Sequence, residues 1–262
     1  MKLPFHHKSE KPQLRMPAPP SIPQLEGASL AALYRAARTG GDFFDFQSIR
    51  GRLIFLLLDI AGRRDQALDI AAAVQDQFHL QVPEVFGGSL VNEADALSQI
   101  TVELNRTIME AAKGVRCAPA FLGSYDEDVG IAFYINAGHT PGLLRDTDGV
   151  QLLAANGLPL GLFSHATHDA QTVVLGPGAA LLVVSKGLVE SRRGRQEFGM
   201  ERLQQSVDKL AFKSANELCS AVLTAVQEFT KNTPGQNDIT AVALMRAAVA
   251  AETELASAAT VR

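Results

Sequence analysis

Three kinds of hydrophobic pattern alternate along the chain. Residues 53–58 are continuously apolar, contain no proline, follow Gly51 and end at Asp59, which predicts a buried central strand. Apolar residues at helical spacing predict one helix over about 66–78 and a longer one over about 93–112, capped by Asn92 and ended by Gly114. The intervening residues 79–91 are predicted to form a loop.

The second half of the chain changes to short alternating or fully apolar segments separated by turns. Strands are predicted over 119–125, 129–137, 142–145, 150–153, 170–175 and 179–184. Two helices at about 199–210 and 214–231 precede a last strand over 239–245, and a first strand is predicted over 27–38. Hairpin-linked strands interleaved with pairs of long helices indicate an α+β fold in which helices cover antiparallel sheets.

Composition divides the chain into three regions. Residues 1–25 are polar and rich in proline, so we expect a flexible lead-in that buries no core. Residues 26–247 contain all the predicted elements and are expected to form one domain. Residues 248–262 are an alanine-rich tail that we expect to fray.

The overall composition restricts the class of protein. The chain has 262 residues, of which 47% are hydrophobic and 20% charged, and its net charge is −4, which is typical of a soluble globular protein. No run of Lys and Arg points to nucleic acid, and no apolar run approaches the length of a membrane span or a signal peptide. Cys117 and Cys219 lie far apart and outside any metal-ligand spacing, which fits a cytoplasmic location.

Two aspartates are the first candidates for chemistry. Asp42 lies in an acidic, glycine-led stretch, and Asp59 follows seventeen residues later at the end of the apolar run. A turn near Gly51 would pair the two strands and bring both carboxylates to one end of a sheet. Converging carboxylates are the hard oxygen ligands that Mg or Mn prefers, although either aspartate taken singly beside a glycine also suits an ordinary turn.

Six short motifs in register resemble those of the SpoIIE branch of the PPM-type metal-dependent serine/threonine phosphatases. The resemblance covers about residues 26–247 and implies a four-layer α-β-β-α sandwich. The motifs are Gly40-Gly41-Asp42-Phe43-Phe44-Asp45, Asp59-Ile60-Ala61-Gly62, Asn136-Ala137-Gly138-His139-Thr140-Pro141, Gly157-Leu158-Pro159-Leu160-Gly161, Gly187-Leu188-Val189-Glu190 and Asn237-Asp238-Ile239-Thr240.

The resemblance also implies a metal site and a reaction. It assigns Asp42, Asp59, Asp238 and the backbone carbonyl of Ile60 as ligands of a pair of Mg or Mn ions. In such a site the metal ions activate a water molecule that attacks the phosphorus in line, so no protein nucleophile is required. The implied substrate is a phosphoserine or phosphothreonine of a regulatory phosphoprotein.

Two positions depart from the family pattern. Lys186 stands where the family has a third metal-ligand aspartate. At about 4 Å and an effective dielectric near 20, a unit charge repels a unit charge by about 4 kcal/mol and a divalent ion by about twice that. A salt bridge from Lys186 to Asp59 or Asp238 would replace part of one metal ion's charge, so we expect one metal ion or none. Extension of Lys186 into solvent would relieve the repulsion but would still leave one ligand missing. Arg38, a candidate phosphate-binding residue, lies one position closer to Asp42 than its family counterpart.

Two functional hypotheses follow. The first is a PPM-type phosphatase whose activity is impaired by Lys186, and the second is a pseudophosphatase that binds a regulatory partner without turning it over. A third interpretation starts from the likeness of Gly40-Gly41-Asp42-Phe43-Phe44 to the signature of diguanylate cyclases. The signature's glutamate is absent and only one predicted strand precedes the motif, so we do not favour a cyclase.

Overall fold

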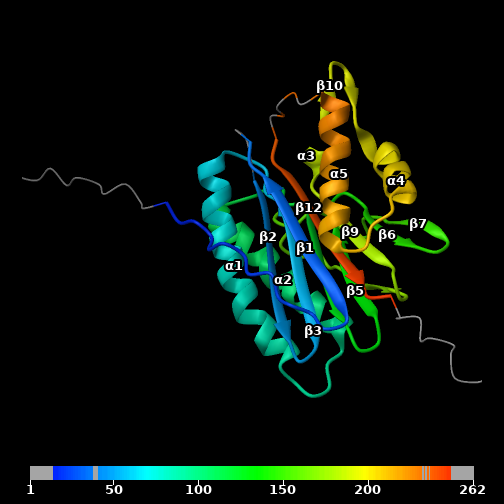
Figure 1. Ribbon diagram of the computed structural model, residues 1–262. Coiled ribbons are helices and arrows are strands. Elements are labelled where there is room, and N and C mark those ends of the chain that lie inside the picture. Colours follow the sequence, from blue (N-terminus) through cyan, green and yellow to red (C-terminus); the bar gives the residue numbers. More distant parts are fainter. Residues whose placement is uncertain (1–13, 38–40, 232, 234, 236, 249–262) are drawn as a thin grey trace, which may run out of the picture.

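The computed structural model describes residues 14–37, 41–231, 233, 235 and 237–248. Predictions for Arg38 and for the chain ends at 1–13 and 249–262 lie outside these residues. Two five-stranded antiparallel sheets form the centre of the molecule (Figure 1). The first contains, in spatial order, β2 (Asp42–Ile49), β3 (Arg52–Asp59), β4 (Ala120–Asp126), β5 (Ile131–Ala137) and β8 (Gln171–Val174). The second contains β1 (Ala28–Arg35), β12 (Ile239–Arg246), β9 (Ala180–Val184), β6 (Gly142–Asp146) and β7 (Gly149–Leu153).

Helices cover the outer face of each sheet. The helices α1 (Arg64–Phe86) and α2 (Glu93–Ala112) pack on the first sheet, and α4 (Gly199–Lys209) and α5 (Ala215–Thr230) pack on the second. A short helix α3 (Lys186–Val189) and the small hairpin β10 (Arg192–Arg193) and β11 (Gln196–Glu197) connect β9 to α4. This arrangement confirms the predicted α+β fold with two helix-covered antiparallel sheets. None of the described helices combines the length and apolar character needed to span a bilayer.

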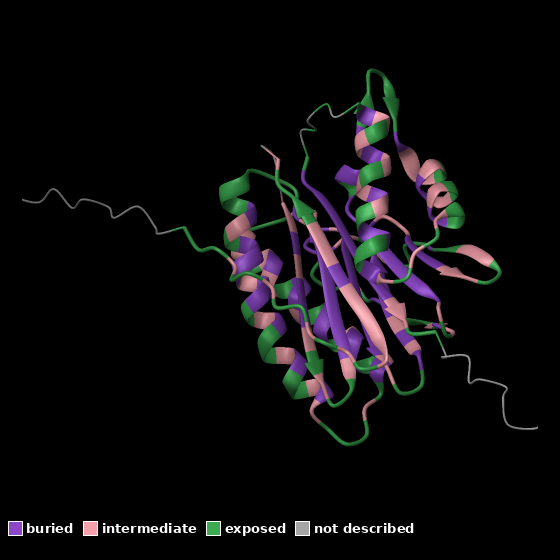
Figure 2. Ribbon diagram, in the orientation of Figure 1, coloured by how far each residue is buried: buried purple, intermediate pink, exposed green. Residues whose placement is uncertain are grey.

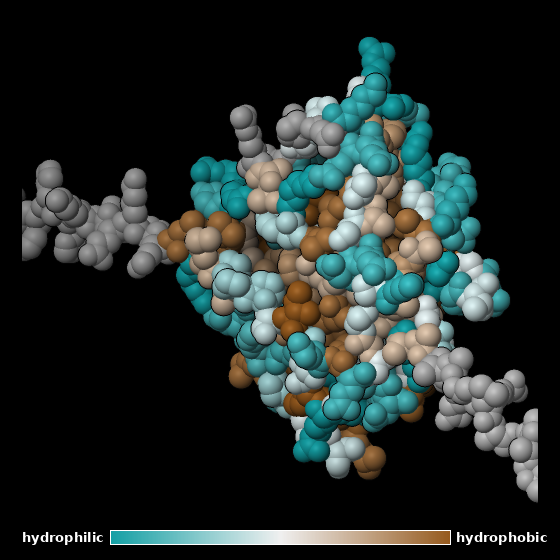
Figure 3. Space-filling view, viewed as in Figure 1, coloured by the Kyte–Doolittle hydropathy of each residue, from teal (hydrophilic) through white to brown (hydrophobic). Residues whose placement is uncertain are grey.

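Three apolar layers hold the sandwich together. One lies between the first sheet and α1 with α2, one lies between the two sheets, and one lies between the second sheet and α4 with α5. The inner strands are accordingly buried along most of their length, whereas the outer faces of the helices are exposed (Figure 2). On the face seen in Figure 3, apolar side chains gather over β1 between α1 and α5, and hydrophilic side chains cover the helices.

The prediction of a loop over 79–91 is wrong for its first eight residues. Helix α1 continues to Phe86 and contains Pro83. Val74, Phe78, Val82 and Phe86 lie four residues apart and all are fully buried, so one continuous apolar stripe favours the helix. This burial outweighs the hydrogen bond that Pro83 cannot donate.

Candidate functional site

The first half of the candidate site is built by one strand pair. β2 and β3 run antiparallel, and their register places Asp42 directly opposite Asp59. Beyond this pair, the Ile60 amide donates to the Gly41 carbonyl at 2.9 Å. A Cβ at Gly41 would lie 2.0 Å from the Ile60 carbonyl oxygen, so only glycine allows this close approach. The two carboxylates therefore share one end of the first sheet, as predicted.

The second sheet supplies the other half. Lys186 begins α3 directly after β9, and Asp238 directly precedes β12. Thr240 on β12 donates from Oγ1 to the Asp42 Oδ2 at 2.6 Å, which joins the two sheets at the site. A Cβ at Gly187 would lie 2.0 Å from the Asp238 carbonyl oxygen, so the start of α3 packs against the start of β12 only because this residue is glycine.

These elements enclose a cavity of about 220 Å³. It contains every predicted site residue that the structure describes, so the fold brings them together. Thr240 was not singled out from the sequence, although it lies two residues after Asp238 in the last family motif. We call this cavity the carboxylate pocket; it is lined by Gly41, Asp42, Asp59, Ile60, Ala61, Gly62, Lys186, Gly187, Glu190, Asn237 and Asp238.

The two opposed carboxylates are poorly compensated by the protein. Burial raises the pKa of Asp42 from 3.8 to about 7, and the charges of Asp59 and Asp238 add to the effect. Hydrogen bonds from Ser185 and Thr240 act in the opposite direction but do not cancel it. Burial also raises the pKa of Asp59. Crowded carboxylates of this kind favour a bound cation.

Asp238 lies at the pocket but is already engaged. Its Oδ2 accepts from the Tyr34 hydroxyl at 2.8 Å and its Oδ1 accepts from the Ala37 amide at 2.6 Å. Burial and this carboxylate together raise the pKa of Tyr34 to about 12. Asp238 therefore fixes the end of β1 against the site, and each of its oxygens already accepts one hydrogen bond.

Lys186 pairs with a residue that the sequence did not suggest. Its Nζ lies 3.2 Å from Glu190 Oε1, one helical turn further on, and 59% of its side chain is exposed. This pair raises the pKa of the Lys186 ammonium. The ammonium is still close enough to oppose, in part, the effect of burial on the Asp59 pKa. Lys186 thus lies at the solvent side of the pocket rather than in a salt bridge to Asp59 or Asp238.

The donor set fits one divalent ion better than two. Among the residues that the structure describes, no three His, Cys, Asp or Glu side chains are arranged so as to hold a metal ion. Asp42, Asp59 and the Ile60 carbonyl remain as a group of hard oxygen donors. Mg²⁺ is commonly bound through one or two carboxylates, with water and substrate phosphate completing the shell. A second ion would also need a ligand at position 186, where Lys186 places a positive charge.

A buried aspartate behind the site was not recognised from the sequence. Asp45 on β2 is 1% exposed. Its Oδ2 accepts from Gln75 Nε2 at 2.9 Å and lies 2.8 Å from His79 Nε2, both on α1. The same Gln75 amide also donates to the Ala18 carbonyl and accepts from the Ala18 amide. Asp45 therefore links β2 to α1 and, through Gln75, to the segment that precedes β1.

Comparison with known proteins identifies relatives of the chain. The chain is 23% identical over 258 residues to Protein IcfG of Synechocystis sp., covering 87% of this chain and 39% of IcfG. It is 23% identical over 231 residues to the phosphoserine phosphatase RsbU of Bacillus subtilis, covering 86% of this chain and 65% of RsbU. The chain therefore spans less than two thirds of either relative.

A solved structure and a family model extend the comparison. The structure of the RsbU and RsbW domains of Rv1364c from Mycobacterium tuberculosis matches with a TM-score of 0.68 and 27% identity, covering 87% of this chain and 64% of that one. The model of the family Stage II sporulation protein E (SpoIIE) matches residues 51–247. This range includes Asp59, Lys186 and Asp238, whereas Asp42 precedes it. The chain belongs to the SpoIIE family, within the PPM-type phosphatases.

Proposed function

We propose that this protein hydrolyses phosphoserine or phosphothreonine on a regulatory protein, at the carboxylate pocket, with one Mg or Mn ion and at a reduced rate. The observation that carries the proposal is the direct pairing of Asp42 with Asp59 at a pocket formed by both sheets. The pKa of each carboxyl is raised in that pocket, so a divalent cation would relieve a repulsion that the protein leaves uncompensated.

Each described residue has a distinct task in this proposal. Asp42, Asp59 and the Ile60 carbonyl would hold the ion, and the hydroxyl of Thr240 fixes the orientation of the Asp42 carboxylate. Asp238 positions the end of β1 through Tyr34 and Ala37. When bound, the ion supplies charge stabilisation for the phosphoryl oxygens and a water of lowered pKa.

Lys186 is the proposed cause of the reduced rate. It occupies the position of a family aspartate, and its ammonium lies within electrostatic reach of Asp59. The same observation, together with the engagement of Asp238, favours a second candidate function. In that alternative the protein is a pseudophosphatase, which binds a phosphoprotein or regulatory partner at this face without hydrolysing it.

The deciding experiment is Mn-dependent hydrolysis of para-nitrophenyl phosphate by the wild type and by Lys186→Asp. In water each unit charge pair is worth about 1 kcal/mol at 4 Å. Exchanging an ammonium for a carboxylate changes the charge of the side chain by two units. Because the metal ion carries two charges, the interaction energy changes by about four times the energy of one unit pair, and this energy is smaller at distances beyond 4 Å. We therefore expect at least about tenfold tighter Mn binding and a corresponding gain in rate at limiting Mn.

Two further variants control the experiment. Lys209→Asp makes the same charge change on an exposed lysine of α4 and should leave the rate unchanged. Asp59→Asn should abolish Mn-dependent turnover. A silent wild type with an active Lys186→Asp would select the pseudophosphatase. A fully active wild type that Lys186→Asp does not improve would show that Lys186 is not inhibitory.

A further inference from the structure

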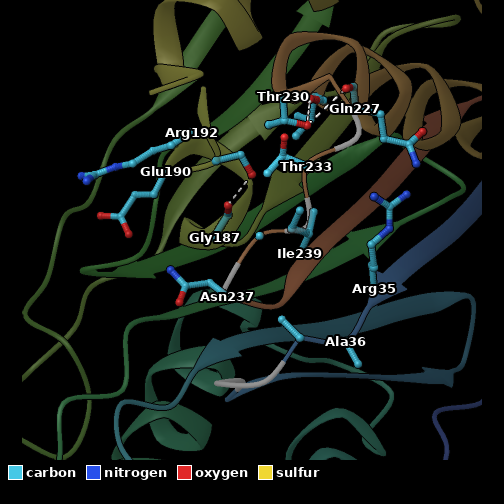
Figure 4. A pocket seen from close by; sticks show the side chains of 14 residues that line it. Arg35, Ala36, Gly187, Glu190, Arg192, Gln227, Thr230, Thr233, Asn237 and Ile239 are labelled. Carbon is cyan, nitrogen blue, oxygen red and sulfur yellow. Dashed lines mark hydrogen bonds between the residues drawn. The ribbon is translucent and has the colours of Figure 1, made fainter. Parts of the chain in front are cut away.

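A second and larger cavity adjoins the carboxylate pocket. Its volume is about 670 Å³, within the range of pockets that bind ligands. The two cavities share Gly187, Glu190 and Asn237 as lining residues. Figure 4 shows Arg35 and Gln227 on one side of this second cavity and Glu190 and Arg192 on the opposite side. A chain segment that enters the carboxylate pocket can therefore continue into this cavity, which we call the flanking pocket.

The flanking pocket carries positive charge on a chain whose net charge is −4. Arg35 is an exposed residue. Its guanidinium donates from Nη1 to the side-chain oxygen of Gln227 at 3.2 Å, when the Gln227 amide is oriented so that its oxygen faces the guanidinium. Its hydrogen-bond partner is thus neutral, and no described carboxylate forms an ion pair with it. Glu190, the acidic residue at the border between the cavities, is compensated by Lys186 at 3.2 Å.

The β10–β11 hairpin extends this positive surface. It contains three arginines, at 192, 193 and 195, and one carboxylate, Glu197. Arg192 pairs with Glu197 across the hairpin but remains 63% exposed. Arg195 is exposed, and within the described chain it forms no ion pair. An anionic ligand would thus share the Arg192 guanidinium with Glu197 and the Arg35 guanidinium with the neutral Gln227, whereas Arg195 has no ion pair among the described residues.

The hairpin is held in place by aromatic contacts with α5. The guanidinium carbons of Arg193 and Arg202 lie 5.2 and 5.0 Å from the centre of the Phe229 ring. Phe198, at the end of the hairpin, packs edge-on against the same ring with 5.6 Å between centroids. Arg202 also donates to the carbonyl of Glu197 at 2.8 Å. Arg193 and Arg202 thus have a structural role, and the other arginines are presented by a supported surface.

We propose that the flanking pocket and the hairpin bind acidic residues that neighbour the phosphorylated residue of the partner protein. The inference rests on the proposed function, because the phosphorylated residue itself would lie in the carboxylate pocket. Extended peptide advances about 3.3 Å per residue, so residues next to the phosphorylated one enter the adjoining cavity. Side chains of Asp or Glu in the cavity would meet Arg35 and Arg192, and those that extend past it would meet Arg195 at the tip of the hairpin.

The test compares two fluorescein-labelled peptides in EDTA, so that no hydrolysis occurs. Both carry one phosphoserine; in one the flanking residues are aspartates and in the other they are asparagines. Exposed charge pairs each contribute about two- to fivefold in affinity, so anisotropy should give an about tenfold lower Kd for the aspartate peptide at low salt. In the triple variant Arg35→Gln/Arg192→Gln/Arg195→Gln, the preference should fall below about twofold.

Two control variants separate docking from general electrostatics and from misfolding. Arg106→Gln removes an exposed, ion-paired arginine from α2, which covers the other sheet, and should keep the full preference. Arg195→Gln alone changes an exposed residue at the hairpin tip and should lower the preference by about twofold, even if the triple variant does not fold. Equal Kd values for the two peptides, or an undiminished preference in Arg195→Gln, would overturn the docking site.

Failure of the docking site and failure of the proposed function give different results. If the aspartate peptide binds preferentially but Mn restores no turnover, the docking site stands and the proposed hydrolysis fails. If both peptides are hydrolysed with equal kcat/KM and bind with equal Kd, hydrolysis stands and the docking site is overturned.

Discussion

Asp42→Asn is expected to stabilise the metal-free protein. The Asp42 carboxylate is held in a mostly buried position opposite Asp59, and its pKa is raised from 3.8 to about 7, first by burial and then by the neighbouring carboxylates. A pKa that is higher in the folded than in the unfolded chain means that ionisation costs folding free energy. At about 1.4 kcal/mol per pKa unit, the cost at full ionisation is about 4 kcal/mol.

The pH dependence of this effect has a defined sign. Below about pH 3, under both pKa values, the carboxyl is protonated in the folded and the unfolded chain, so the wild type and Asp42→Asn should be equally stable. As the pH rises from about 3 to 7, the unfolded chain releases its proton first and the wild type loses stability. Above pH 7 the difference should be constant, at about 2–4 kcal/mol in favour of the variant.

Urea unfolding in EDTA at several pH values measures this difference directly. Asp208→Asn, at an exposed carboxylate of α4, is the matched control and should change the free energy of unfolding by less than about 0.5 kcal/mol at each pH. If Asp42→Asn is no more stable than the wild type at pH 8 in EDTA, the carboxylate is not under repulsion and the electrostatic reasoning for a cation site is refuted.

Three further predictions concern the site and its support. Titration calorimetry should find one Mn ion per chain, and none in Asp59→Asn; two ions per chain would contradict the one-ion site. Asp45→Asn should lower the free energy of unfolding by about 2–3 kcal/mol, measured with urea, because it replaces a buried carboxylate that has three hydrogen-bond partners. A loss as small as that of Asp208→Asn would show that these contacts contribute little. Gly187→Ala should lower the free energy of unfolding by about 1–3 kcal/mol and weaken Mn binding, because the added Cβ displaces the start of β12. Gly176→Ala is the control, since a Cβ there has nothing within 4 Å. Equal effects of the two substitutions would refute the close-packing explanation.

Much of the fold could be predicted because most elements carry strong local patterns. The antiparallel pairing of the strands that carry Asp42 and Asp59 followed from one buried run and one turn, and the structure confirms it. The extension of α1 through Pro83 was missed because residues 79–91 were predicted as a loop, although the four-residue apolar spacing continued to Phe86. The two-residue strands β10 and β11 were missed because so few residues carry no periodicity.

The site was predicted less completely because its contacts join distant parts of the chain. The prediction that Lys186 replaces a metal ligand came from the sequence alone, but its pairing with Glu190 depends on the short helix α3. The engagement of Asp238 by Tyr34 joins residues about 200 positions apart. Side-chain contacts of this kind have no local sequence signature, so the sequence could not show that Asp238 also accepts hydrogen bonds from Tyr34 and Ala37.

The pairing of β1 with β12 has a consequence for folding during synthesis. Ala28 lies opposite Arg246, so the first strand of the domain forms its ladder with the last one. A ribosome that has reached residue 230 has made all of the first sheet and most of the second, yet β1 still lacks its neighbour and Asp238 has not been added. The final step of folding is therefore also the step that completes the site. Contacts between such distant residues form slowly, so the nascent domain exposes an unpaired strand edge and lacks a finished site until the last strand is released.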